Sequence, residues 1–164
     1  MVKLKRPQIR GKEFMMLAVR EARRNLASLE GGPFGACIVK NNKVIAVSRN
    51  TVLKYDASCH AEINAIRMAS KKLRTYDLSG CRIYSTTEPC PMCFSAIHWA
   101  RIGSVVYGTS IADAGRIGFR ELRISCRTMK QKGGSTVKIR PGFMLDACRA
   151  LFDDWMRLPG KQVY

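Results

Sequence analysis

Four side chains in two short segments of the 164-residue chain have the types and spacing of a metal site. His60 stands two residues before Glu62, and the later segment PCPMC supplies Cys90 and Cys93 as a close pair. One histidine and two cysteines are three ligands for a tetrahedral zinc ion, which leaves the fourth position open for water. An open position is typical of catalytic zinc, because structural zinc is normally closed by four protein ligands.

These side chains predict hydrolysis of an amino group on a ring carbon. Zinc lowers the pKa of its bound water from about 15.7 to about 7, so that hydroxide is available at neutral pH. We expect that zinc hydroxide to attack the amino-bearing carbon while Glu62 passes protons to the ring and to the departing ammonia, which is worth about 10²–10⁴ in rate. The alternative is a non-catalytic zinc interaction module. The remaining histidine, His98, is expected to pack or hydrogen-bond beside Trp99 rather than to bind metal.

Apolar periodicity predicts helices alternating with strands. Helices are expected at residues 13–29, 57–73, 91–100 and 143–156, and strands at 35–39, 44–47, 82–86, 104–107 and 137–139. The basic, glycine-bearing segment 127–136 is expected to be a mobile loop. This order indicates a single α/β domain over residues 1–164, a three-layer α/β/α sandwich with a mixed central sheet of about five strands and a basic tail at about 1–10.

Both metal-binding segments are expected at helix N-termini. The helix dipole lowers the pKa of a thiol at that position, so Cys90 and Cys93 are predicted to be held as thiolates. The other five cysteines stand mostly among apolar neighbours and predict reduced, buried thiols, which favours a cytoplasmic location. They are Cys37, Cys59, Cys81, Cys126 and Cys148. No apolar run approaches the length of a membrane span, and the start of the chain lacks the apolar core of a secretory signal.

The charge is strongly positive, with 29 Lys and Arg against 12 Asp and Glu and a formal net charge of +17 at pH 7. Such an excess is typical of proteins that bind phosphate groups, but it is also compatible with a basic surface that is only solvated. The basic residues are spread from Lys3 to Lys161, and no recognised RNA-binding motif is present. Nucleic acid therefore stays the second choice of partner, after a small nucleobase.

With its HAE and PCPMC segments the chain resembles the zinc-dependent cytidine/deoxycytidylate deaminase-like superfamily. The segments GGPFGACIV, TEPCPMCFSAIHWARI and VVYG resemble the branch that holds bacterial guanine deaminases and tRNA adenosine deaminases. Phe34, the loop that ends at Phe119 and the final Tyr164 are similar to the guanine enzymes. The resemblance implies one catalytic zinc per subunit, the conversion of guanine to xanthine and ammonia, and a homodimer that exchanges its C-terminal segments.

The resemblance also implies roles for further residues. Glu121 falls where the guanine enzymes place a second acid, although many of them carry Asp there; the alternative is a surface carboxylate paired with a neighbouring arginine. Substrate contacts are implied for five residues, with a turn, core, capping or frayed-terminus role as the alternative for most. They are Asn50, Phe34, Asp113, Ala61 and Tyr164. Guanosine, ammeline, adenine, cytosine and tRNA adenosine remain open as substrates.

Overall fold

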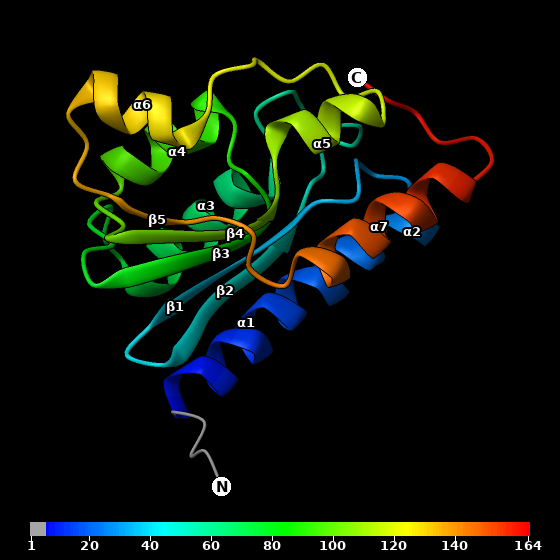
Figure 1. Ribbon diagram of the computed structural model, residues 1–164. Coiled ribbons are helices and arrows are strands. Elements are labelled where there is room, and N and C mark those ends of the chain that lie inside the picture. Colours follow the sequence, from blue (N-terminus) through cyan, green and yellow to red (C-terminus); the bar gives the residue numbers. More distant parts are fainter. Residues whose placement is uncertain (1–5) are drawn as a thin grey trace, which may run out of the picture.

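A five-stranded mixed sheet forms the middle of the computed structural model, which describes residues 6–164 (Figure 1). The strands are β1 (Gly35–Lys40), β2 (Lys43–Arg49), β3 (Cys81–Thr87), β4 (Ser104–Thr109) and β5 (Lys138–Arg140). Their order across the sheet is β2-β1-β3-β4-β5. Strand β1 is antiparallel to both of its neighbours, whereas β3, β4 and β5 are parallel. The predicted mixed sheet of about five strands is confirmed.

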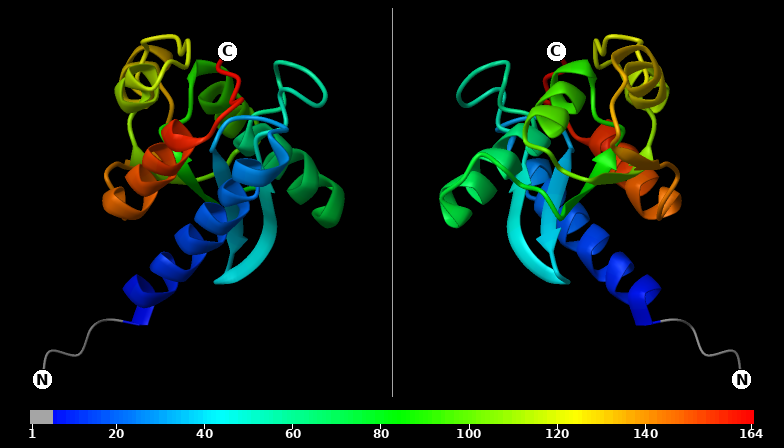
Figure 2. Two further views of the ribbon diagram at one scale, coloured as in Figure 1. Left: turned by 90° about the vertical axis from the view of Figure 1, so that its right-hand side faces the viewer. Right: turned by 90° about the vertical axis from the view of Figure 1, so that its left-hand side faces the viewer.

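Helices cover both faces of the sheet. They are α1 (Arg6–Arg23), α2 (Asn25–Ser28), α3 (Ala61–Leu73), α4 (Pro91–Trp99), α5 (Ile111–Arg116), α6 (Cys126–Gly133) and α7 (Leu145–Arg157). Helices α1 and α7 lie side by side on one face, and α3 and α4 lie on the other (Figures 1 and 2). The molecule is therefore the three-layer sandwich that the sequence predicts.

The two layers of core between sheet and helices follow from the alternation of side chains along the strands. In β3, Ile83 is fully buried in the core under α3 and α4, while its neighbour Tyr84 packs in the core under α1. Parallel strands buried on both faces are expected to be apolar, and the middle of β4 (Val105, Val106 and Tyr107) is, whereas β3 is apolar at Ile83 and Tyr84 and ends in the buried polar residues Ser85, Thr86 and Thr87. This double burial fixes the end of β3, from which the metal-binding segment continues.

Three segments differ from the sequence prediction. Residues 6–10 of the expected tail belong to helix α1, and residues 1–5 lie outside the described residues. Helix α5 lies within a segment for which no helix was predicted. The predicted loop at 127–136 is wrong, because most of it is helix α6, which Ser125 caps by accepting a hydrogen bond from the Thr128 N–H and which buried Cys126 anchors. Gly134, with a φ of 64°, then ends the helix in the left-handed conformation that glycine adopts freely.

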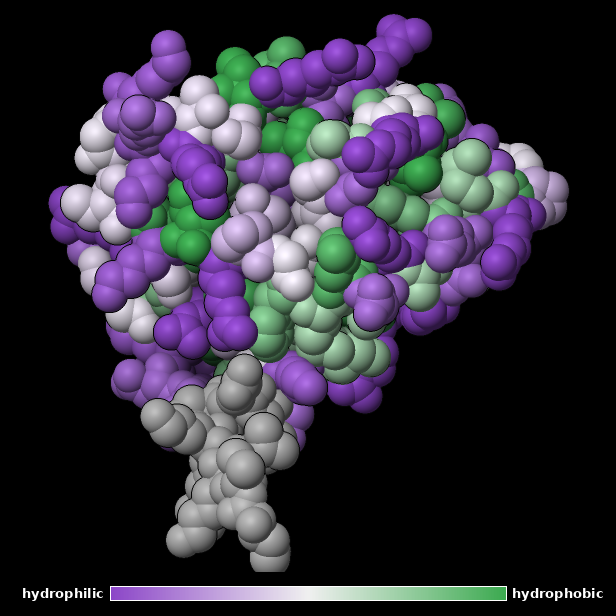
Figure 3. All heavy atoms as spheres, in the orientation of Figure 1, coloured by the Kyte–Doolittle hydropathy of each residue, from purple (hydrophilic) through white to green (hydrophobic). Residues whose placement is uncertain are grey.

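Hydrophilic side chains are spread over the face shown in Figure 3, with smaller hydrophobic areas between them. None of the described helices is both long and apolar enough to cross a membrane. All seven cysteines are buried and free of disulfide bonds, which was predicted for the five outside the metal site.

Candidate active site

The three predicted metal ligands meet at the N-termini of two helices. His60 is the N-cap of α3, Cys90 is the N-cap of α4, and Cys93 follows in the first turn of α4. Their ligand atoms all lie within 4.8 Å of one another, and Cys90 Sγ is 3.7 Å from His60 Nδ1. The ligand atoms of a tetrahedral zinc, each about 2.0–2.3 Å from the ion, are about 3.6 Å apart. The donor set and its spacing therefore fit zinc.

The pKa values of the two cysteines are shifted in opposite directions. A hydrogen bond from Cys93, together with the nearby His60, lowers the pKa of Cys90 to about 4. The pKa of Cys93 is instead raised, because its thiol donates to Cys90 and is buried. Burial alone would lower the pKa of His60, but its bond to Cys90 and the charge of Glu62 outweigh burial and raise it to about 9. Zinc binding therefore requires the loss of protons from Cys93 and His60.

Glu62 lies in the first turn of α3 with its carboxylate beside these ligands. Ser85 Oγ donates to Glu62 Oε1 at 2.9 Å, and the Cys93 thiol approaches Oε2 at 3.5 Å. Burial raises the pKa of Glu62 above its usual value, because water no longer solvates the charged form. The raised pKa suits a group that both accepts and returns protons.

A small cavity opens on the metal ligands. Besides His60, Glu62 and Cys90, it is lined by Phe34, Asn50, Thr87, Glu88 and Glu121. Its volume is about 10 Å³, roughly the space that one water molecule needs. Three of the residues for which the sequence implied a role, Phe34, Asn50 and Glu121, are thus brought together around the predicted ligands.

Tyr164 is hydrogen-bonded to Asn50, one of the residues that line this cavity. The Tyr164 hydroxyl donates to Asn50 Oδ1 at 2.6 Å and accepts from the Gly32 N–H at 3.0 Å. Asn50 is 1% exposed, and its Oδ1 also accepts from the Val52 N–H, which fixes the plane of the amide. Phe119 packs edge-on against the Tyr164 ring and against Phe34, so the C-terminus docks on its own chain in this single subunit.

Glu121 faces the cavity without an ion pair among the described residues. Neither Arg120 nor Arg123 bonds its carboxylate, so the structure does not support the surface-pair alternative. Burial, and then the negative charge of Cys90, raise the pKa of Glu121 to about 7. A second carboxyl group therefore sits opposite Glu62 with a pKa close to neutrality.

The family follows from a match between residues 9–109 and the model of the cytidine and deoxycytidylate deaminase zinc-binding region. The chain belongs to this deaminase family. A deaminase of this family holds one zinc ion in a helix-terminal site, and His60, Cys90 and Cys93 are the residues that fit it here.

Two of the relatives that cover most of the chain are guanine deaminases, and a solved tRNA:A34 deaminase covers 85% of it at 30% identity and a TM-score of 0.74. Guanine deaminase from Bacillus subtilis (strain 168) is 45% identical over 154 residues, which is 92% of this chain and 97% of that protein. The solved structure of guanine deaminase from Nitrosomonas europaea is 30% identical with a TM-score of 0.79, covering 87% of this chain and 82% of that one. A tRNA-specific adenosine deaminase from Aquifex aeolicus is 42% identical over 99 residues, 59% of this chain and 65% of that protein.

Two residues for which the sequence implied substrate contacts lie outside the cavity of this deaminase. Asp113 completes a capping box at the start of α5: it accepts from Ser110 and pairs with Arg116. It therefore takes the capping role that was its alternative. Ala61 is fully buried in the core and does not line the cavity. His98 bonds Ser135 Oγ at 3.0 Å, as expected for a histidine that does not bind metal.

Sequence reasoning missed two polar residues that position the site. Ser85 is 2% exposed and donates to Glu62. Glu88, which directly precedes the Pro89-Cys90 pair, accepts from the Ile111 N–H at 3.2 Å and the Cys126 N–H at 2.9 Å, so it ties two later segments to the metal-binding loop. The available signal was the position of these polar residues, in and directly after the strand that leads into the cysteine pair, because a polar residue that is buried there needs a partner.

Proposed function

We propose that the protein hydrolyses guanine to xanthine and ammonia. The observation that carries this proposal is that the cavity at the metal donors has room for about one water molecule and is lined by Asn50, to which the C-terminal Tyr164 is hydrogen-bonded. The similarity to Bacillus subtilis guanine deaminase spans 92% of the chain, whereas the similarity to the Aquifex enzyme spans 59%. A free base suits a closed cavity better than a base attached to nucleic acid does.

In the proposed reaction, zinc held by His60, Cys90 and Cys93 supplies a Lewis acid that makes a water molecule nucleophilic at neutral pH. Glu62 accepts a proton from that water and returns protons to the ring nitrogen and to the amino group as it leaves. Ser85 holds the carboxylate of Glu62 in one orientation during both transfers. The carbon–nitrogen bond breaks, a carbonyl replaces it, and ammonia departs.

The remaining lining residues hold the base. Asn50 Oδ1 is occupied by Val52 and Tyr164, while its Nδ2 has no acceptor among the described residues and is free to donate to an acceptor on the purine. The carboxylate of Glu121 can accept an N–H of guanine and take part in proton transfer. Phe34 offers a ring face or edge to the base. Because the cavity has room for about one water, a base enters only after Tyr164 or Glu121 shifts.

The test is ammonia release by zinc-loaded protein against guanine, guanosine, ammeline, adenine, cytosine and a tRNA with adenosine in its anticodon loop. We expect turnover of guanine at least 100-fold faster than of any other substrate in this panel. Turnover of guanosine, ammeline, adenine or cytosine at a similar rate would overturn the assignment of guanine while keeping the deaminase chemistry.

A second candidate is deamination of adenosine in tRNA. It is favoured by a cleft of about 650 Å³ that shares Glu88 and Glu121 with the cavity and carries Arg116, Arg120 and Arg123. Arginine is suited to phosphate, and a tRNA enzyme needs phosphate contacts beside an extruded base. If the tRNA is the one substrate of the panel that is turned over, deamination of tRNA adenosine replaces deamination of guanine as the function.

We further propose a homodimer in the cytoplasm. Leu122 and Val163 are apolar, 65% and 41% exposed, and lie in the segments beside the docked C-terminus, which supports an interface there. Seven free cysteines support a reducing compartment. Light scattering on the purified protein measures the mass, and a monomer at micromolar concentration would overturn the dimer.

A further inference from the structure

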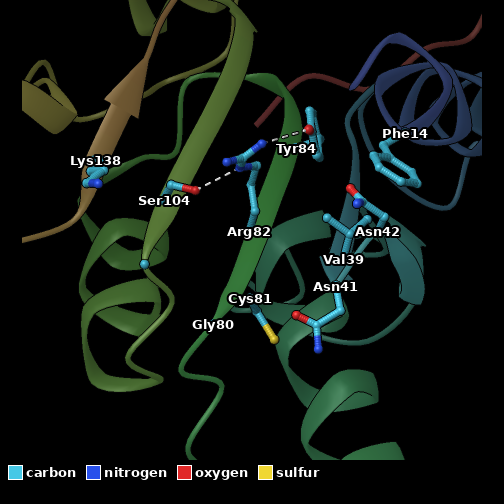
Figure 4. Close-up of a pocket in the computed structure, with 11 residues that line it drawn as sticks. Phe14, Val39, Asn41, Asn42, Gly80, Cys81, Arg82, Tyr84, Ser104 and Lys138 are labelled. Atoms are coloured by element: carbon cyan, nitrogen blue, oxygen red, sulfur yellow. Dashed lines mark hydrogen bonds between the residues drawn. The ribbon is translucent and has the colours of Figure 1, made fainter. Parts of the chain in front are cut away.

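A separate cleft of about 420 Å³ lies on the α1 side of the sheet, at the end away from the metal donors (Figure 4). It is formed where β3, β4 and β5 begin and where β1 turns into β2. Arg82, Ser104 and Lys138 line it from the three parallel strands, and Phe14 lines it from α1. Nothing in the proposed deamination uses these residues.

Arg82 is held in position over the middle of this cleft. Its Nε donates to Ser104 Oγ at 3.0 Å, and its Nη1 donates to the Tyr84 hydroxyl at 3.5 Å (Figure 4). Ser104 is also the register partner of Arg82 in the parallel pair of β3 and β4. These two hydrogen bonds hold the guanidinium on one side. Its remaining N–H groups are free to bind an anion in a bidentate manner.

The positive charge of the cleft is not balanced by its own walls. Lys138 is exposed on β5, and Arg82 is exposed on β3. No acidic side chain lines the cleft within the described residues, and neither of these two cations forms an ion pair with a described residue. Two cations thus line a hollow that is open to an anionic ligand.

The wall opposite Arg82 carries side-chain amides and a small accessible part of an aromatic ring. Phe14 lines the cleft but is 7% exposed, and its ring centroid lies 5.6 Å from that of Tyr84, which is 3% exposed. Asn41 and Asn42 follow in the β1–β2 turn, where both hold a positive φ, of 49° and 59°, and line the cleft. Side-chain amides both donate and accept hydrogen bonds, as the polar edge of a nucleobase does.

We propose that this cleft binds a mononucleotide, with its phosphate on Arg82 and Lys138 and its base against the amides of Asn41 and Asn42 and the accessible part of Phe14. The volume is in the range of small-ligand sites, which is about 300–1,000 Å³. A second copy of the chain is a poor occupant of this particular cleft, because Arg82 and Lys138 would have to face the basic surface of that copy without an acidic residue in the lining to balance them. A longer polynucleotide shares the phosphate chemistry and is distinguished by experiment.

The nucleotide and the substrate base bind at the same time. Arg82 lies at the start of β3 and the metal-binding loop follows its end, and a seven-residue strand spans about 20 Å. Binding to the cleft is therefore measured independently of deamination, so that its failure and the failure of the proposed activity are distinct results.

The experiment is calorimetric titration of the zinc-loaded protein with adenosine 5′-monophosphate, adenosine, inorganic phosphate and a 20-nucleotide RNA. We expect one monophosphate per chain, and binding of adenosine and of phosphate at least tenfold weaker. Phosphate that binds as tightly as the nucleotide would overturn the role of the wall opposite Arg82. An RNA that binds while the mononucleotide does not would overturn the mononucleotide in favour of a polynucleotide track.

The variant pair Arg82→Gln with Lys138→Gln should raise the dissociation constant of the nucleotide at least tenfold. The matched control, Arg20→Gln with Lys71→Gln, removes the same two charges from exposed residues outside the cleft and should leave it unchanged. If both double variants weaken nucleotide binding equally, the site is overturned in favour of general charge attraction. If the first pair fails to fold, nucleotide-induced amide shifts in the unmodified protein must fall on Asn42 and Ser104, and shifts elsewhere would overturn the site.

Discussion

Two features of the surroundings of Glu62 have opposite effects on its pKa. It is buried, which favours its protonated form, yet it accepts a hydrogen bond from Ser85, which favours its charged form. Burial is the larger effect, and the pKa of Glu62 is raised. A group balanced between the two forms exchanges protons at lower cost than a carboxylate that is fully solvated or firmly paired.

The substitution Glu62→Gln tests this balance at nearly constant shape. The amide retains an oxygen for Ser85 but cannot carry a proton between water and substrate. We expect turnover of guanine to fall at least about 10²-fold, which is the usual contribution of general acid–base catalysis to the rate. The zinc content, measured by atomic absorption, should stay at one ion per chain because the three ligands are unchanged.

Glu13→Gln is the matched control, since Glu13 is exposed on α1 and has no side-chain partner among the described residues. It should leave both turnover and zinc content as they are. Near-normal activity in the Glu62 variant would contradict the proton-transfer role. Loss of zinc together with activity would show instead that Glu62 supports the metal site.

The elements that hold the metal ligands were largely predictable from the sequence. Apolar periodicity indicated α3, and Pro91 suits the first turn of α4, so His60 and the cysteine pair were expected at helix starts. Helix α6 was not predicted, because it is short and polar and depends on the Ser125 cap and on one buried cysteine. Short helices of this kind are stabilised by tertiary packing, which periodicity does not report.

The closure of the cavity depends on contacts that no local pattern encodes. Tyr164 reaches Asn50 across 114 residues of sequence, and Glu121 lies in an irregular segment between α5 and α6. Family resemblance implied roles for these residues, but their meeting point depends on how the last segment packs against Phe119. The structure was therefore needed to show that Asn50, Glu121 and Tyr164 surround one cavity or its entrance.

Tyr164→Phe tests the docking of the C-terminal segment. The variant keeps the ring against Phe119 and removes the hydroxyl that joins Asn50 to Gly32. The two lost hydrogen bonds are worth about 0.5–1.5 kcal/mol each, or about 1–3 kcal/mol together, so we expect weaker docking over the bound base to raise the KM for guanine about 5- to 160-fold. Tyr55→Phe, at a tyrosine that is 68% exposed, is the control and should leave KM unchanged.

The same contact predicts a pH limit for docking. Burial raises the pKa of Tyr164 to about 12, above the value of about 10 for an exposed tyrosine. A raised pKa means that the docked state is favoured fully below pH 10 and loses this stabilisation as the pH rises through 12. The absorbance at 295 nm, taken as the difference between the unmodified protein and Tyr164→Phe, should rise near pH 12. A rise near pH 10 would show that the segment is undocked.

At the scale of the whole molecule, the acidic side chains are few and many are already engaged. Glu62, Glu88 and Glu121 line the metal cavity, and others pair with arginines or lysines at the surface. Most of the positive charge is therefore left uncompensated on the surface, and both of the larger clefts contain part of it. The charge faces the solvent, whereas the cavity that performs the chemistry is lined by carboxylates.

This arrangement predicts how salt affects the enzyme. Guanine is neutral at pH 7, so its binding to the closed cavity releases no counterions, and kcat/KM for guanine should change less than about twofold between 50 and 200 mM NaCl. A tRNA substrate that contacts 6–10 phosphates would lose about 10³–10⁵ in affinity over the same range. The measurement is initial rates at subsaturating substrate, with potassium glutamate replacing the chloride salt as a control for anion-specific effects. A steep loss of guanine turnover with either salt would mean that the positive surface takes part in the reaction, because a neutral base in a closed cavity has no other reason to respond.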